Sequence, residues 1–375
     1  MKDLLTPALL LNKDKLVINC ERMRNRVSDT IALRVHMKTA KSIDVYQLAT
    51  NDGFKGITVS TLAEAAYFAG HGIDDILYAV GIVPGKLRHV QQLVAQGCDL
   101  KVITDTKSII SELNAVAKQL DFNVKLLIEI DCGGARGGVL ADSCDLLEIA
   151  KLINSATNIE YYGLMTHAGH SYHSKSISEI IEIAEQERLA VIQAARRLKN
   201  ELGLHSNILS TGSTPTATYA KSFEGLTEVR PGVYMFCDID QYFIGSCGLE
   251  DIAISVLTTV IGHNKKANRI LIDAGGLALS KDISASEFSS ATGYGWITDH
   301  KGNHIQDAYV ESVHQEHGLI KFTGIKDIPF DNFPVGSHLR ILPIHACMTV
   351  AAFKQYQVHD NNNNLLDNWS RVNHW

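Results

Sequence analysis

Several features that mark other classes of protein are missing from this sequence. No apolar run approaches the roughly 18 residues that a membrane-spanning helix requires. Lys and Arg number 35 against 41 Asp and Glu, so the formal net charge of -6 gives no overall positive field to attract nucleic acid or an anionic membrane. Because 45% of the residues are hydrophobic and only 7 are proline, disordered and collagen-like chains are excluded as well. We expect a globular protein that binds a small molecule.

The chain also lacks the paired cysteines of disulfide frameworks and zinc ribbons. Its 7 cysteines are odd in number and widely spaced, with no Cys-x-x-Cys pair, which is typical of a reducing compartment. Near the N-terminus, a short apolar stretch, Ala8–Leu11, is bounded by Pro7 and Asn12, and no small-residue cleavage site follows it. We therefore predict no signal peptide and a cytoplasmic location.

From about residue 30 to residue 240, short β-type runs alternate with segments of helical periodicity. Eight such pairs predict an α/β fold, a (β/α)8 or TIM barrel. The predicted strands are Leu33–Lys38, Gly56–Ser60, Asp75–Val80, Leu100–Asp105, Val124–Asp131, Tyr161–Gly169, Asn207–Gly212 and Glu228–Phe236. The predicted helices include Thr61–Ala69, Lys86–Ala95, Ser108–Leu120, Ser143–Ile153, Ile177–Leu198 and Thr216–Ser222.

The sequence pattern changes after Gly245, where predicted strands rich in Thr, Val and Ile follow one another without helical periodicity between them. This pattern predicts a β-rich second domain. Its predicted strands are Ile252–Ile261, Arg269–Asp273, Leu319–Thr323, His338–Leu342 and Thr349–Tyr356. The run Asn361–Asn364 is predicted to be a hairpin turn. We place the barrel domain at residues 13–244 and the β-rich domain at residues 245–375, with residues 1–12 joining the latter.

The first predicted strand concentrates basic side chains. In its period-two pattern the apolar residues share one face, and Arg34, His36 and Lys38 share the other. The basic face points into the barrel, where an anionic ligand or neighbouring acids must offset its charge. A lysine among other cations loses its proton more readily and becomes a nucleophile toward an aldehyde, so Lys38 is the Schiff-base candidate. The alternative is an ordinary ion pair at the barrel rim; Lys41 has the opposite parity and ranks below Lys38.

The segment Ser210–Thr216 follows the seventh predicted strand. Loops after strands seven and eight of barrels often bind phosphate, and this loop offers a glycine, several hydroxyls and backbone N–H groups. It is predicted to be a phosphate loop. A plain turn is the alternative, because such residues are common in turns.

Glycines surround Arg136 after the fifth predicted strand. The glycines of Gly133–Gly138 do not fit G-x-G-x-x-G, and Gly81–Lys86 fails the P-loop template, so neither nucleotide motif is predicted. Arg136 lies where catalytic groups gather in barrels and is suited to hold a phenolate or a carboxylate. A salt bridge to Asp131 is the alternative.

A candidate metal site lies in the β-rich domain. On an extended chain, the side chains of His345 and Cys347 face the same side, and an imidazole with a thiolate suits zinc. Two protein ligands leave positions open for substrate or water. The alternative is a buried histidine beside a small core cysteine.

Six segments, in this order, resemble the D-serine dehydratase and D-threonine aldolase family. Members of that family are fold-type III pyridoxal phosphate (PLP) enzymes with an alanine-racemase-like barrel and a β domain. The similarity spans nearly the whole chain. The segments are Arg34–Lys41, Gly169–Tyr172, Gly212–Pro215, Glu228–Tyr234, Asp273–Gly275 and Pro343–Cys347.

The resemblance implies roles for the matched residues. Lys38 matches the first lysine of the family's R-P-H-x-K-T-H-K pattern and would carry the cofactor as a Schiff base. Val35 and Ala40 replace the proline and the second histidine of that pattern, so substrate positioning or proton transfer near residue 40 is expected to differ. The other implied cofactor-binding residues are His36, Arg136, Tyr172, Gly212, Ser213 and Thr214. The implied metal ligands are His345 and Cys347.

The activity implied is that of a PLP- and metal-dependent lyase acting on D-β-hydroxy amino acids. Within the family, H-x-C with zinc resembles the dehydratases and H-x-D the aldolases, so Cys347 favours a D-serine dehydratase-like reaction that yields a 2-oxo acid and ammonia. The alternatives are D-threonine aldolase-type cleavage of the Cα–Cβ bond, an amino acid racemase, and a non-catalytic PLP carrier. The resemblance also implies a homodimer.

Overall fold

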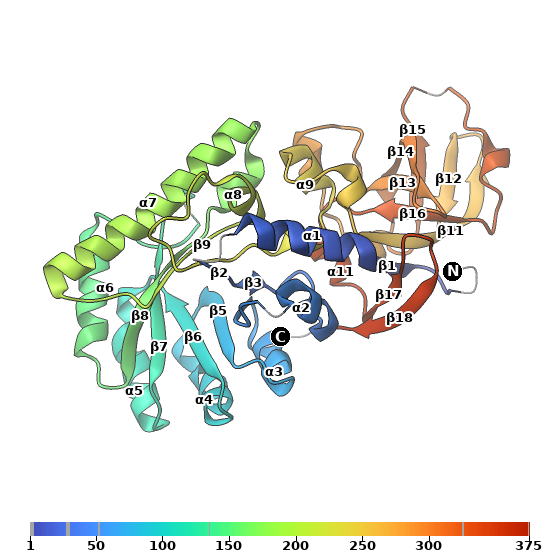
Figure 1. Ribbon diagram of the computed structural model, residues 1–375. Helices are drawn as coiled ribbons and strands as arrows, with labels where there is room; N and C mark the ends of the chain where they lie inside the picture. Colours follow the sequence, from blue (N-terminus) through green and yellow to red (C-terminus); the bar gives the residue numbers. More distant parts are fainter. Residues whose placement is uncertain (1–3, 28–30, 52, 135, 325, 374) are drawn as a thin grey trace. The chain divides into compact units, whose positions relative to one another are not determined.

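Figure 1 shows the computed structural model of the protein, which describes residues 4–27, 31–51, 53–134, 136–324, 326–373 and 375. The chain divides into two compact units. One comprises Arg22–Gly232, and the other comprises Met1–Glu21 together with Val233–Asn373. Within the described ranges, no helix combines the length and the apolar character needed to cross a membrane.

A closed sheet of parallel strands forms the centre of the unit Arg22–Gly232. Across the described residues its order is β2-β10-β9-β8-β7-β6-β5-β4-β3. The two ends of this order, β2 and β3, are separated along the chain by Arg34 alone, so the sheet closes into a barrel and the predicted fold class is confirmed. The strands are β2 (Ala32–Leu33), β3 (Val35–His36), β4 (Ile57–Val59), β5 (Asp75–Gly81), β6 (Asp99–Thr104), β7 (Val124–Ile130), β8 (Ile159–Thr166), β9 (Ile208–Thr211) and β10 (Glu228–Val229).

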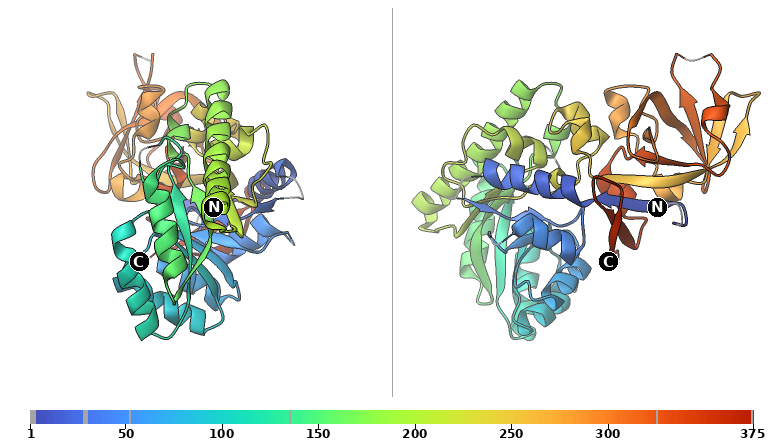
Figure 2. Two further views of the ribbon diagram at one scale, coloured as in Figure 1. Left: turned by 90° about the vertical axis from the view of Figure 1, so that its left-hand side faces the viewer. Right: turned by 45° about the vertical axis from the view of Figure 1, so that its right-hand side comes forward.

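Helices pack on the outer side of these strands, as Figures 1 and 2 show. The longest of them, α7, begins at the N-cap Ser176, whose side chain accepts a hydrogen bond from Glu179 N, and ends at Gly203 with a φ of 68°. It lies against β8 and β9. The helices of this unit are α2 (Ile43–Thr50), α3 (Leu62–Gly70), α4 (Leu87–Ala95), α5 (Ile110–Gln119), α6 (Cys144–Ser155), α7 (Ile177–Leu202) and α8 (Thr214–Tyr219); α1 (Lys13–Arg26) spans the boundary between the units.

Charged side chains fill the amino end of the barrel. Arg34 Nε lies 2.6 Å from Glu228 Oε2, and Arg34 Nη1 lies 2.8 Å from Asp75 Oδ1. Lys101 Nζ lies 2.5 Å from Asp75 Oδ1 and 2.7 Å from Asp99 Oδ2. The expectation that neighbouring acids offset the basic face is thus confirmed for Arg34. Asp75 and Asp99 are the first residues of β5 and β6, which places this network at the end of the barrel where the strands begin.

The second unit contains a sheet of mostly antiparallel strands in the order β12-β15-β14-β13-β16-β11-β1-β17-β18. An additional pairing of β12 with β11 closes six of these strands into a small barrel. The strands are β1 (Ala8–Asn12), β11 (Ile254–Asn264), β12 (Arg269–Ile272), β13 (Trp296–Asp299), β14 (His304–Val313), β15 (Gly318–Phe322), β16 (His338–Leu342), β17 (Gln355–His359) and β18 (Leu365–Ser370). Its helices are α9 (Ile239–Ile244), α10 (Gly276–Leu279) and α11 (Ala346–Val350). Asn361–Asn364 lies between the antiparallel strands β17 and β18, as predicted.

Three predicted strands are wrong in part. Leu33–Lys38 is interrupted at Arg34 and ends at His36, so Met37 and Lys38 lie in the turn that follows β3. Thr349–Tyr356 begins in helix α11, because Asp238 accepts the Ala346 N–H and holds the first helical turn against the β propensity of Thr and Val. Glu228–Phe236 forms a strand only at β10, since Pro231 has no N–H to continue the ladder. The sequence analysis did not predict the helices α1, α2, α9 and α10 or the strands β1, β13 and β14.

Candidate active site

Lys38 follows β3 at the carboxyl end of the barrel. In the turn after β3, Met37 N donates to Thr58 O at 2.8 Å and Lys41 N donates to Met37 O at 2.8 Å. These bonds hold the Lys38 backbone beside β4, and its side chain is half-buried. Active sites of such barrels are built at this end of the strands.

Lys41 is engaged elsewhere. Its φ is 51°, and its Nζ lies 3.1 Å from Glu64 Oε1 on α3. The Glu64 side chain is fully buried and also accepts the Ser60 N–H at 2.9 Å. The amine of Lys41 is therefore held toward α3, which leaves Lys38 as the candidate nucleophile.

Two neutral histidines flank Lys38. Burial and then the charge of Lys38 lower the pKa of His36 well below its usual value, so His36 is a neutral imidazole. Burial, followed by the charges of Lys38 and Arg136, lowers the pKa of His167 to about 3. His167 Nδ1 donates to Gly212 O at 3.1 Å. No spacing rule singles out His167, although a position directly after β8 is one where barrel sites gather.

The predicted phosphate loop joins β9 to α8. Gly212 has a φ of 118°, and a Cβ there would lie 2.8 Å from Arg230 N, so this position requires glycine. Ser213 is the N-cap of α8, and its hydroxyl lies 2.8 Å from Ser171 Oγ on the neighbouring loop. Ser213 and Thr214 are both buried. The loop is thus held from two sides.

Arg136 and Tyr172 lie on the loops after β7 and β8. Arg136 is exposed, and its charge acts on His167 and on Glu129. Burial raises the pKa of Glu129, and the charge of Arg136 opposes this. The Tyr172 ring is half-buried, with its centroid 6.4 Å from that of His167. Both side chains therefore belong to the surroundings of Lys38.

Arg230, directly after β10, is a member of this group that the sequence analysis missed. Its buried guanidinium donates to Ser210 Oγ and to Thr166 O. Burial lowers the pKa of Arg230, and the carboxylates of Glu228 and Glu187 oppose this. The period-two pattern could have found it, because Arg230 and Glu228 share one side of the predicted strand.

His345 and Cys347 lie where β16 leads into α11. The extended chain predicted here is wrong for Cys347, which belongs to the helix. His345 precedes the first helical residue, with a φ of -129° and a ψ of 107°, and its imidazole still forms a hydrogen bond with the Cys347 side chain. The pair therefore meets across a helix start instead of along a strand.

The surroundings of His345 are anionic. His345 Nδ1 donates to Asp282 Oδ2 at 2.8 Å. Burial alone would lower the pKa of His345, but Asp282, Cys347 and Asp238 outweigh it and raise the pKa to about 11. The hydrogen bond from His345 lowers the pKa of Asp282 to about 2. Since Nδ1 is engaged, Nε2 is the atom left to bind a metal.

The predicted site residues thus form two groups. One group lies in the unit Arg22–Gly232 and comprises Lys38, His36, Arg136, Tyr172, Gly212, Ser213 and Thr214. The other comprises His345 and Cys347, in the second unit. In the part of the chain that the structure describes, no three His, Cys, Asp or Glu side chains are grouped so as to hold a metal ion.

Comparison with known proteins places the chain among enzymes of this architecture. The family model "Alanine racemase, N-terminal domain" matches residues 11–240, and "Putative serine dehydratase domain" matches residues 253–359. The chain is 38% identical to the D-threo-3-hydroxyaspartate dehydratase of Delftia sp., over 99% of this chain and 98% of the relative. It is 32% identical to the D-serine dehydratase of Dictyostelium discoideum, over 100% of this chain and 98% of the relative.

Solved structures agree with this result. The Delftia dehydratase superposes with a TM-score of 0.96 at 38% identity, over 100% of this chain and 99% of the other. Further structures of that enzyme include a histidine-to-alanine mutant and a cysteine-to-alanine mutant in the metal-free form. The D-threonine aldolase of Arthrobacter sp. is a more distant relative, 25% identical over 95% of this chain and 87% of its own length.

Proposed function

The chain belongs to the alanine-racemase-like family of PLP-dependent lyases of D-hydroxy amino acids. From that premise we propose that it eliminates water from a D-β-hydroxy amino acid, and that water then hydrolyses the resulting enamine to a 2-oxo acid and ammonia. The observation that carries the proposal is Lys38, half-buried at the carboxyl end of a barrel strand. Its charge acts on two neutral histidines, and one of them, His167, donates to Gly212 O in the phosphate loop.

The residues around Lys38 fit PLP. The loop of Gly212, Ser213 and Thr214 supplies hydroxyl and backbone groups for a phosphate. The buried Nδ1 of His170 has no hydrogen-bond partner among the described residues, which a polar ligand in this space would remedy. Arg136 and Tyr172 would contact the ring side of the cofactor.

In the reaction, Lys38 would hold the cofactor covalently and, once the substrate amine has displaced it, Lys38 Nζ would take the proton from the substrate Cα. PLP, when bound, supplies an electron sink for the charge left on Cα. His36 and His167 are neutral imidazoles, so neither adds a positive charge beside Lys38.

His345 and Cys347 would hold a divalent metal, which we propose to be zinc, because a thiolate and an imidazole form a soft ligand pair. A metal there supplies a Lewis acid for the leaving β-hydroxyl. The acidic neighbours Asp282 and Asp238, which favour the protonated imidazole, would equally stabilise a metal cation. In the Delftia dehydratase, the mutated histidine and cysteine are also separated by one residue, and its cysteine mutant is in the metal-free form.

The comparisons also favour dehydration over aldol cleavage, because the relatives that match at 38% and 32% identity are dehydratases, whereas the D-threonine aldolase matches at 25%. The homodimer and the cytoplasmic location stay predictions.

The test is a screen of D- and L-amino acids for 2-oxo acid release. D-serine, D-threonine and D-threo-3-hydroxyaspartate should be the productive class, and D-threonine should yield 2-oxobutanoate and ammonia. Acetaldehyde and glycine would instead establish the aldolase. Chelation should abolish turnover and leave the visible absorbance of bound PLP unchanged, with activity restored by added zinc; a carrier protein would show no turnover before chelation.

A further inference from the structure

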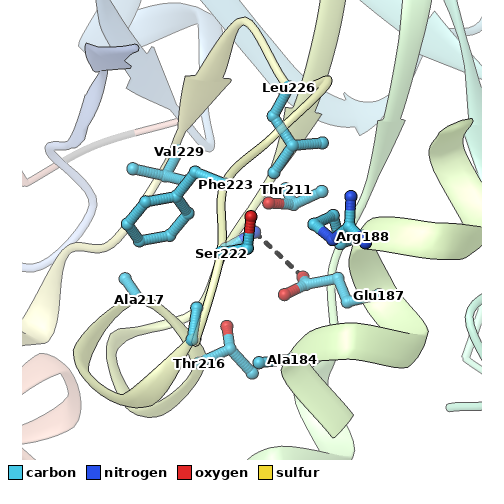
Figure 3. A pocket seen from close by; sticks show the side chains of 12 residues that line it. Ala184, Glu187, Arg188, Thr211, Thr216, Ala217, Ser222, Phe223, Leu226 and Val229 are labelled. Carbon is cyan, nitrogen blue, oxygen red and sulfur yellow. Dashed lines mark hydrogen bonds between the residues drawn. The ribbon is translucent and has the colours of Figure 1, made fainter. Parts of the chain in front are cut away.

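A buried carboxylate stands behind the phosphate loop. Glu187 lies on α7, is only 2% exposed, and its Oε1 accepts two backbone N–H groups, one from Ala168 and one from Gly212, each at 2.9 Å. Figure 3 shows Glu187 reaching from α7 toward the loop, with Thr216 and Thr211 nearby. One oxygen therefore ties the chain after β8 to the chain after β9.

The same carboxylate reaches a third point. The Thr216 side chain, on α8, forms a hydrogen bond with Glu187. Gly212 is consequently held on both sides, because its N–H donates to Glu187 and its carbonyl accepts from His167 Nδ1. The peptide orientation at the start of the phosphate loop is set before any ligand arrives.

A carboxylate in this place has an energetic cost. Burial raises the pKa of Glu187, and the hydrogen bonds from Gly212 and Ala168 oppose this, with Arg230 adding a smaller effect of the same sign. The cavity beside it measures only about 10 Å³, which is about the room of a single water molecule. Little more than one water molecule therefore fits beside the carboxylate.

We propose that Glu187 is a positioning residue for the cofactor phosphate: by accepting the Ala168 and Gly212 N–H groups, it holds the loop in the shape that binds the phosphate. It does not touch the phosphate itself. This inference rests on the proposed PLP site. Its consequence is specific, since losing Glu187 should weaken the recognition of the phosphate and leave the attachment of the aldehyde to Lys38 intact.

The experiment compares PLP with pyridoxal, which has the same ring and aldehyde but no phosphate. The full-length chain is freed of cofactor and titrated with each compound, and binding is followed by visible absorbance. Wild type should bind PLP much more tightly than pyridoxal. Glu187→Leu should lose at least tenfold in PLP affinity, with pyridoxal affinity within about twofold of wild type.

Two conservative variants sharpen the test. Glu187→Gln keeps an oxygen that accepts both N–H groups and should restore PLP affinity to within about threefold of wild type. The Glu187→Asp side chain is one methylene shorter, so this variant should lose about fivefold in PLP affinity and nothing in pyridoxal affinity. Glu187→Asp keeps the charge and the burial of the side chain, so it can replace Glu187→Leu in the test if Glu187→Leu does not fold. Glu201→Leu, at an exposed position on the same helix, is the matched control and should change neither affinity.

The outcomes separate the hypotheses. A loss confined to PLP supports the positioning role. Equal losses for PLP and pyridoxal, or no loss in any variant, would overturn it while leaving the phosphate loop assigned. If wild type binds both compounds equally well, the phosphate loop itself is wrongly assigned, and the inference fails with it.

Discussion

The environment of Lys38 shows how single residues are prepared for chemistry. Arg34 lies directly before β3, and its charge is balanced by Glu228 and Asp75 at the other end of the barrel. His36 is kept neutral by burial. The three basic residues of the predicted strand therefore have different environments. Arg34 is held in ion pairs, His36 is a neutral imidazole, and Lys38 carries its amine at the carboxyl end of the barrel.

We expect Lys38→Ala to lower kcat/KM by at least about 10³-fold, because no other amine would take over both attachment and proton removal. Borohydride reduction of the wild-type holoenzyme should attach the cofactor to Lys38, as read by peptide mapping. The matched variant Lys41→Arg keeps the contact with Glu64 and should still be labelled at Lys38. Label at any other lysine would contradict the assignment.

Asp282 orients the proposed metal ligand His345 through the hydrogen bond to Nδ1. Removing such a partner typically lowers metal affinity about 10–100-fold. Asp282→Asn should therefore weaken zinc binding by this factor, measured by competition with a chromogenic chelator. The exposed Asp331→Asn is the control and should bind zinc as wild type does. Unchanged affinity in Asp282→Asn would show that the carboxylate does not orient the ligand.

At the scale of elements, the loops after the strands decide what the barrel can bind. The loop between β9 and α8 depends on a backbone conformation that only Gly212 provides, and the loop after β8 is joined to it through Ser171 and Glu187. In the second unit, the start of α11 brings His345 and Cys347 together, with Asp238 holding the first turn.

Gly212→Ala should destabilise the protein by about 2 kcal/mol, since it adds a strained φ and a Cβ contact of 2.8 Å with Arg230 N. Gly203→Ala, at the end of α7, also has a positive φ but meets nothing within 4 Å, so it should cost only about 1 kcal/mol. Urea unfolding measures the free energy of unfolding of both variants. Equal losses of stability in the two variants would mean that the Cβ contact with Arg230 N costs no free energy.

For the whole molecule, the charged network at the amino end of the barrel links stability to pH. Burial alone would raise the pKa of Asp75, but the hydrogen bonds and charges of Arg34 and Lys101 lower it. Because the pKa is depressed in the folded state, this contribution is present above the unfolded pKa of about 3.9 and is lost as the pH falls through the lower folded value.

We therefore expect wild type to lose stability steeply below about pH 4. Asp75→Asn should be less stable than wild type at pH 7, and its stability should decrease less between pH 5 and pH 3. Urea unfolding at several pH values provides the measurement. A variant with the same pH dependence as wild type would show that Asp75 is not a source of the acid sensitivity.

The amino-acid pattern by itself determined the alternation of strands and helices, the closure into a barrel and the change to a β-rich unit, because these follow from local periodicity. It also singled out Lys38 as a candidate from the parity of a predicted strand, although Lys38 itself lies in the turn after β3. The roles of Arg230, His167 and Glu187 were decided only by the tertiary structure. Their partners come from other strands and loops, and no spacing along the chain encodes which of them meet. The same holds for α11, where a contact from Asp238, distant in sequence, replaced the expected strand with a helix.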